Sequence, residues 1–175
     1  MKERQKTLLD FQVDSLTNSI VNTLTGDSFP TDITRLLKSD LKNVTKRNGW
    51  SFDWTEELRK NDREIYKLTI VNNPTVIQGI ISFTIREDNI FMNLVESAPF
   101  NIGANKVYEG VAGNLVAFAC KTSFKHHLHG FVSFFSKTNL IDHYVKSLGA
   151  YHFGGHLMII TTESAQILVD RYFKE

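Results

Sequence analysis

Apolar residues in the first part of the chain recur at steps of three or four positions. They are Leu9, Val13, Leu16, Ile20 and Leu24. This spacing puts them on one face of a helix, and Gly26 and Pro30 are typical of the point where a helix has ended. The pattern predicts an N-terminal amphipathic helix within residues 1–26, which packs on the domain or on a second copy of the chain in a homodimer.

After residue 64, apolar residues recur at every second position instead of every third or fourth. Three runs alternate apolar and polar residues, at 65–70, 79–85 and 89–96. This alternation predicts three consecutive antiparallel strands. Ahead of them, residues 31–37 are a weaker strand candidate and residues 40–46 a short helix candidate.

The second half of the chain alternates helix and strand patterns. We expect a helix over 108–124, a strand over 131–135, a helix over 140–148, a hairpin of 151–153 and 156–160, and a helix over 163–173. Strand–helix–strand units after a meander imply an α/β fold with a mixed sheet and helices on both faces. The chain then forms one domain over residues 1–175, with its core at 31–160 and a C-terminal helix at 163–175.

Composition narrows the class of protein. The chain has 175 residues, 42% of them hydrophobic and 22% charged, with a formal net charge of +1. This size and composition favour one globular domain, and the near-neutral charge disfavours broad nucleic-acid binding. The single cysteine, Cys120, excludes a disulfide framework, and no stretch is apolar enough to span a bilayer. The default expectation is a cytoplasmic protein.

A carboxylate closes the third strand of the meander. Glu96 shares its parity with the apolar residues Ile90, Met92 and Leu94. Burial disfavours the charged form of a carboxyl group, which is how a general base is tuned toward neutral pH. The alternative is that the strand has already ended and Glu96 is solvated.

Small residues open the helix that follows. Gly110, Ala112 and Gly113 allow a close approach to the backbone, and free N–H groups at a helix start form an anion site. The alternative is that they serve only close packing of the helix on the sheet.

This order of elements and motifs resembles the GNAT superfamily of acyl-CoA-dependent N-acyltransferases. The resemblance covers roughly residues 31–160. Gly110-Val111-Ala112 is similar to the second half of that family's phosphate loop, and Tyr144 with Leu148-Gly149 is similar to its next helix.

The resemblance implies acetyl transfer from acetyl-CoA to the primary amine of a small molecule or peptide, without a metal. Glu96 would be the base and Tyr144 the acid that protonates the departing thiolate; as a core residue, Tyr144 would have no such role. Acetyl-CoA would lie between the strand ending at Glu96 and the strand at 131–135. The implied cofactor-binding residues are Leu94, Val95, Val107, Gly110, Val111, Ala112, Gly113, Asn114 and Asn139.

Two departures favour a second hypothesis, a catalytically inactive GNAT-like binding or assembly module. Val107 stands where the family has Gln or Arg, and Glu109 puts a negative charge inside the phosphate loop. Glu109 is compatible with cofactor binding only if its side chain points away from the ligand.

Other candidate residues are clustered aromatics and histidines. Trp50 and Trp54 either cover the core or form an aromatic wall beside the substrate. His126, His127 and His129 fit a solvated loop better than a zinc site, because neighbouring side chains in a loop diverge. Cys120, in the middle of a helix, fits a buried small residue rather than a nucleophile.

Overall fold

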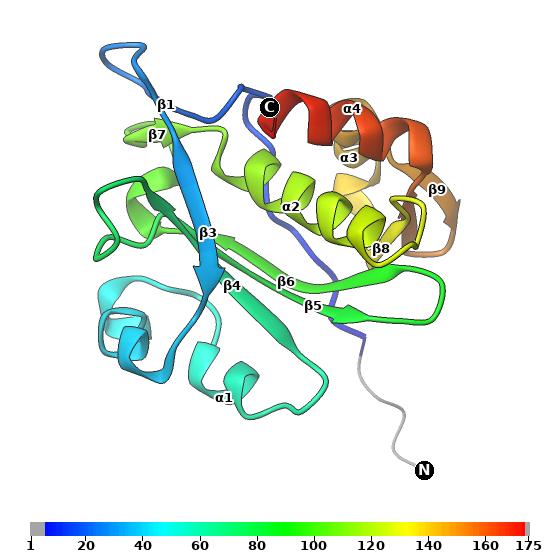
Figure 1. Cartoon of the computed structure of the whole chain (residues 1–175), viewed down its shortest axis with the longest axis horizontal. Coiled ribbons are helices and arrows are strands. Elements are labelled where there is room, and N and C mark those ends of the chain that lie inside the picture. The colour runs from blue at the N-terminus through cyan, green and yellow to red at the C-terminus, as the bar shows by residue number, and fades with distance from the viewer. Residues whose placement is uncertain (1–5, 174–175) are drawn as a thin grey trace.

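The computed structural model describes residues 6–173, in which seven strands form one mixed sheet with helices on both faces (Figure 1). In spatial order the strands are β3 (Thr31–Arg35), β4 (Glu64–Ile70), β5 (Gly79–Ile85), β6 (Ile90–Ser97), β8 (Val132–Phe135), β10 (Leu157–Ile160) and β9 (Tyr151–Gly154). All neighbours are antiparallel except β6 and β8, which are parallel. The predicted meander and the C-terminal hairpin are therefore confirmed.

Four α-helices and four 3-10 helices complete the fold of residues 6–173. They are α1 (Trp54–Leu58), α2 (Val111–Lys125), α3 (Ile141–Leu148), α4 (Thr162–Tyr172), η1 (Lys38–Asn43), η2 (Lys46–Asn48), η3 (Pro99–Asn101) and η4 (Thr138–Leu140). The weak helix candidate at 40–46 is the 3-10 helix η1, and the predicted C-terminal helix is α4. No helix among residues 6–173 is both long and apolar enough to cross a membrane.

Helices α1 and α2 lie on opposite faces of the sheet (Figure 1). On one face, the ring of Phe118 in α2 packs against Tyr66 and Phe83, with centroids 4.8 and 6.1 Å apart. On the other face, Ser82 donates a hydrogen bond to Glu57 of α1. Neighbouring residues of β5 thus point to opposite helices, as the alternation along a strand requires.

The predicted N-terminal helix is wrong. Residues 7–19 are mostly extended, and β1 (Ile20–Asn22) then forms a small sheet with β2 (Ser28–Phe29) and β7 (Tyr108–Glu109). Leu9, Phe11 and Val13 are buried while Asp10, Gln12 and Asp14 are exposed, which is the alternation of a strand and not of a helix. Contacts with distant elements override the three-and-four spacing, and Leu24 on the expected stripe is 95% exposed.

The helix predicted from residue 108 begins later, at Val111. Tyr108 and Glu109 pair with β1, and Gly110 has a left-handed backbone with φ of 89° that ends this pairing before the helix starts. A residue without Cβ adopts this conformation at little cost.

Candidate functional site

Strands β6 and β8 separate soon after they begin. Their parallel ladder covers Ile90 opposite Val132 and Phe91 opposite Ser133, and no further pair continues it in the described part of the chain. Beyond it, Leu9 lies beside β8: its N–H donates to the Phe135 carbonyl at 2.7 Å, and its carbonyl accepts from the Lys137 N–H at 3.1 Å. Residues 7–19 are called the N-terminal segment below, and through Leu9 this segment lies beside the end of β8 where the pairing with β6 has stopped.

Glu96 lies in β6 beyond this divergence and is 6% exposed. Its carboxylate accepts three hydrogen bonds, from the N–H groups of Ser51 at 2.6 Å and Phe52 at 3.3 Å and from Trp54 Nε1 at 2.9 Å. These donors stabilise the negative charge of a buried carboxylate. Glu96 is thus a fixed acceptor, and the solvated alternative does not hold.

Contrary to what its parity predicts, Glu96 does not share a face of the sheet with Ile90 and Met92, because β6 contains a bulge. Ser82 pairs with Leu94 but Phe83 pairs with Met92, so β6 has one extra residue, Asn93, in a β-bulge. A bulge reverses the alternation along a strand. Glu96 consequently faces α1, whereas Met92 pairs with Phe83 on the α2 face.

A cavity of about 880 Å³ lies between the end of β6 and the N-terminal segment. Its lining includes Glu96 and Val95 on β6, Phe11 and Asp14 on the segment, and Phe52. Trp50 and Trp54 are 5% and 1% exposed and are not among the lining residues, so they cover the core in this state. Mixed apolar and polar walls with a few carboxylates, here Asp10, Asp14 and Glu96, are typical of a small-molecule site.

Tyr144 of α3 is completely buried and reaches the N-terminal segment. Its hydroxyl donates to the carbonyl of Phe11 at 2.7 Å, and the rings of Tyr144 and Phe11 lie 4.8 Å apart. Burial raises the pKa of the Tyr144 phenol far above its usual value, so the hydroxyl keeps its proton. As folded, this phenol is a core residue that holds the segment.

The start of α2 is already occupied by a carboxylate. Gly110 N–H donates to Asp14 Oδ1 at 3.1 Å, and Asp14 Oδ2 pairs with Lys106 Nζ at 3.2 Å. A carboxylate beside the positive end of a helix is stabilised by the aligned peptide dipoles. Glu109, the expected obstacle, lies in β7 opposite Val21, and Asp14 takes the position instead.

The segment also contacts the backbone of this turn. A Cβ on Gly110 would overlap Thr17 Oγ1 and would lie 2.7 Å from the Ser19 carbonyl. Thr17 N–H donates to Tyr172 Oη at 3.1 Å, which fixes the segment to α4. While the segment lies there, the turn has no room for a pyrophosphate.

The remaining residues implied by the resemblance have mixed positions. Leu94, Val95, Val111, Ala112, Gly113 and Asn114 are buried, whereas Val107 and Asn139 are exposed. The side chain of Asn114 donates to Thr31 Oγ1 at 3.1 Å. The structure thus places Glu96 and Val95 at the cavity, whereas the start of α2 is in contact with the N-terminal segment.

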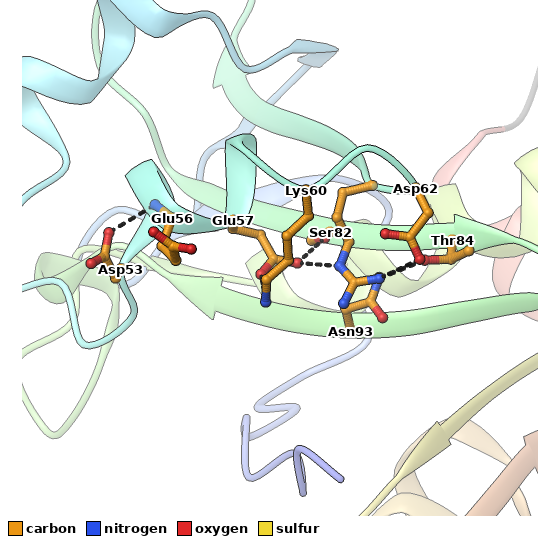
Figure 2. A network of polar contacts seen from close by, with 9 residues as sticks. Asp53, Glu56, Glu57, Lys60, Asp62, Ser82, Thr84 and Asn93 are labelled. Carbon is orange, nitrogen blue, oxygen red and sulfur yellow. Dashed lines mark hydrogen bonds and ion pairs between the residues drawn. The ribbon is translucent and has the colours of Figure 1, made fainter. Parts of the chain in front are cut away.

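A buried polar network holds α1 on the sheet (Figure 2). Glu57, 3% exposed, accepts from Ser82 Oγ at 2.7 Å, Arg63 Nε at 2.8 Å and Lys60 Nζ at 3.1 Å. Because α1 also carries Trp54, this network fixes the indole that donates to Glu96.

The sequence interpretation missed Asp14, Phe11 and His143 as parts of this region. His143 Nε2 accepts a hydrogen bond from the Val13 N–H at 2.9 Å, a contact across 130 residues. The alternation of Leu9, Phe11 and Val13 was the available signal for an extended segment. Nothing local to Asp14 indicates its contact with Gly110.

Other reactive groups do not contribute to this site. Cys120 is fully buried, and burial raises the pKa of its thiol, which suppresses the reactive thiolate. Within residues 6–173, no three His, Cys, Asp or Glu side chains gather closely enough to hold a metal ion.

Comparison with known proteins finds likeness in structure but not in sequence. The spermidine N-acetyltransferase from Vibrio cholerae in complex with CoA and spermine matches with a TM-score of 0.53 and 17% identity, over 78% of this chain and 98% of that chain. A mutant AtaT toxin bound to the C-terminus of the antitoxin AtaR and acetyl-CoA matches with a TM-score of 0.56 and 17% identity, over 79% and 97%.

No family model matches the chain, and no curated protein matches its sequence. At this identity, the likeness concerns the arrangement of helices and strands. The structure confirms the α/β class expected from the sequence, and this chain has, in divergent form, the fold of the GNAT N-acetyltransferases.

Proposed function

We propose that this chain is an acyl-CoA-dependent N-acyltransferase that transfers an acetyl group to the primary amine of a small molecule or peptide. The observation that carries this proposal is Glu96: a buried carboxylate beside a cavity, at the point where the two parallel strands of a GNAT fold diverge. Acetyl-CoA would supply the activated acyl group.

Glu96 is suited to take a proton from an amine. A carboxylate has about four sites that accept hydrogen bonds, and three donors already fix this one in position. The remaining site is available to an ammonium group or a water molecule in the cavity. An amine of a lysine type has a pKa of about 10.4 and must lose a proton before it attacks, which is the step Glu96 would assist.

Tyr144 would be the proton donor. Burial raises the pKa of its phenol, so the proton is present, but the Phe11 carbonyl now accepts the hydrogen bond. The turn at Gly110 likewise does not fit a pyrophosphate as the chain is folded, because Asp14 and Thr17 lie against it. The cofactor roles of Val107 and Asn139, and the substrate roles of Trp50 and Trp54, remain proposals from the resemblance.

The test is the melting temperature of the purified protein with acetyl-CoA. A ligand at about one hundred times its Kd stabilises the folded state by about 2.7 kcal/mol. No shift at millimolar acetyl-CoA, for the full chain and for variants with a weakened N-terminal segment, would rule out the enzyme.

If acetyl-CoA binds, Glu96→Gln tests the base. We expect turnover to fall strongly with the acetyl-CoA shift retained, because an amide cannot take the proton. Glu87→Gln, at an exposed position of the β5–β6 turn, is the matched control. Equal turnover in Glu96→Gln and wild type would remove Glu96 from this role.

The second candidate is a catalytically inactive binding or assembly module with this fold. It is favoured by the Asp14 carboxylate on the Gly110 N–H, where an acyl-CoA would place its phosphates. The same melting experiment decides between the two, since a module of this kind gives no shift in any variant.

A further inference from the structure

The N-terminal segment lies at three places that the proposed function assigns to acetyl-CoA, namely the end of β8, Tyr144 and the turn at Gly110, which together are called the channel below, and a fourth contact fixes it to α4. Leu9 pairs with the diverging end of β8, and the Phe11 carbonyl accepts from Tyr144 Oη. Asp14 binds the Gly110 N–H, and Thr17 binds Tyr172 Oη. These contacts follow one another along the segment, from the sheet to the start of α2.

The chemistry of each contact matches the part of the ligand that would replace it. The backbone of the segment beside β8 takes the position of an extended amide chain. The carbonyl of Phe11 accepts the hydrogen bond of the Tyr144 hydroxyl, which is the group that would protonate the leaving sulfur. A carboxylate, with Lys106 at 3.2 Å, takes the position of a phosphate at a helix start. The segment therefore satisfies the same donors that the ligand needs.

We propose that the N-terminal segment is an intramolecular competitor of acetyl-CoA, so that the chain as folded is an autoinhibited state and the segment must leave the channel before the ligand enters. This inference rests on the proposed function. The segment is held mainly by the buried side chains of Leu9, Phe11 and Val13, while Asp10, Gln12 and Ser15 are exposed. Such a short contact is compatible with release that leaves the sheet and α2 intact.

A competitor of this kind has a quantitative consequence. The apparent Kd is the intrinsic Kd divided by the fraction of molecules whose channel is open. A substitution that weakens the segment therefore tightens acetyl-CoA binding although it removes no contact with the ligand. A change of about 1.4 kcal/mol in the closed state corresponds to a tenfold change in Kd.

The first experiment measures acetyl-CoA binding to the full chain and to Asp14→Ala and Phe11→Ala by calorimetry. Asp14→Ala removes the contacts with Gly110 and Lys106, and Phe11→Ala removes the ring stacked on Tyr144 without changing a charge. We expect both variants to bind about tenfold more tightly than the wild type. Asp27→Ala, an exposed aspartate beyond the segment, is the control and should bind like the wild type.

The second experiment follows hydrogen exchange of the unmodified chain with and without acetyl-CoA. The amides of Leu9, Val13 and Thr17 are hydrogen-bonded in the closed state and should exchange faster when the ligand is bound. This measurement holds even if a variant fails to fold.

Three results would overturn the inference. Equal Kd values in wild type, Asp14→Ala and Phe11→Ala, with unchanged exchange of the segment, would show that the ligand binds beside it, and the proposed function would stand. Tighter binding in Asp14→Ala alone, with unchanged exchange, would show only a local effect of charge. No binding to any of the three proteins would remove the proposed function together with this inference.

Discussion

The carboxylate of Asp14 accepts a hydrogen bond from the amide of Gly110 at 3.1 Å, across 96 residues of sequence. This contact joins an N-terminal segment without regular structure to the start of α2, and it puts an anionic group of the chain at the positive end of that helix. Gly110 makes the contact possible, since Thr17 and Ser19 lie against the space that a Cβ would need.

Substitution of Gly110 by alanine should therefore loosen the segment. A non-glycine residue in the left-handed region costs about 1–3 kcal/mol, and overpacking of a filled space costs about a further 1–3 kcal/mol. We expect Gly110→Ala to lower the free energy of unfolding by about 3 kcal/mol and to speed hydrogen exchange at Leu9 and Val13.

Gly103→Ala is the matched control for this prediction. Gly103 has a φ of 87°, close to the 89° of Gly110, but a Cβ there meets no atom within 4 Å. It should show the backbone strain alone, with normal exchange of the segment. Identical destabilisation by the two substitutions, measured by urea unfolding, would contradict the steric role of Thr17 and Ser19.

Trp54 should act on the reaction through Glu96. Trp54→Phe removes the Nε1 donor at 2.9 Å, and a hydrogen bond to a charged group is worth about 1.5–3 kcal/mol. We expect a loss of stability in this range and a lower kcat in an acetyl-transfer assay, with the KM for acetyl-CoA little changed.

Trp50→Phe separates the hydrogen bond from the loss of ring volume. Trp50 is also buried, at 5% exposure, but its indole makes no hydrogen bond with Glu96. Both substitutions leave a similar space in the core, but only Trp54→Phe removes a hydrogen bond from Glu96, so kcat should fall further in Trp54→Phe than in Trp50→Phe. Equal kcat values for the two variants would exclude Trp54 as a positioning residue.

Glu57 should be among the most sensitive polar positions. Loss of a buried hydrogen-bond partner costs about 1–3 kcal/mol, and here Ser82 is fully buried, whereas the Lys60 and Arg63 side chains are 45% and 20% exposed and regain some water. Glu57→Ala deprives Ser82, Lys60 and Arg63 of a shared acceptor (Figure 2), and we expect a destabilisation of this order by urea unfolding.

Glu56→Ala is the neighbouring control. The Glu56 side chain is 59% exposed and pairs with exposed Arg59, so its removal should change stability by about 0.5 kcal/mol or less. A similar effect of the two substitutions would mean that the network around Glu57 does not hold α1 on the sheet.

Local patterns in the sequence predicted most of the sheet. The alternation at 65–70, 79–85 and 89–96 corresponds to β4, β5 and β6, and Gly149 ends α3 in a left-handed conformation as its type predicts. Such signals are short in range, because strand alternation and helix caps depend on neighbouring residues.

Long-range contacts determine the parts of the structure that local sequence patterns did not predict. The bulge at Asn93 turns Glu96 to the face of α1, yet no residue near it differs from ordinary alternation. The segment from Leu9 to Thr17 has both a helical and a strand period, and its partners His143, Tyr144 and Tyr172 lie more than 120 residues away. A single sequence without those partners favours the wrong period.

The buried tyrosines Tyr144 and Tyr172 should make the fold sensitive to alkaline pH. Burial raises the pKa of both phenols in the folded state above the value of 10.0 that applies in the unfolded chain. The folded state therefore holds more protons than the unfolded state once the pH exceeds about 10, and stability must fall as the pH rises. Below pH 10 the two buried phenols make their full contribution to the stability of the folded state.

The slope of this loss tests the contact between Tyr144 and Phe11. Each phenol that is protonated in the folded state but ionised in the unfolded state lowers the free energy of unfolding by about 1.4 kcal/mol for every pH unit above its unfolded pKa. Tyr144→Phe removes one such group, so its free energy of unfolding, measured in urea at a series of pH values above 10, should decline less steeply by about this amount. The variant also loses the hydrogen bond to the Phe11 carbonyl, which lowers stability below pH 10 by about 1 kcal/mol and frees the N-terminal segment. An unchanged slope would mean that Tyr144 ionises in the folded protein, and then its hydroxyl could not be the buried donor to the Phe11 carbonyl.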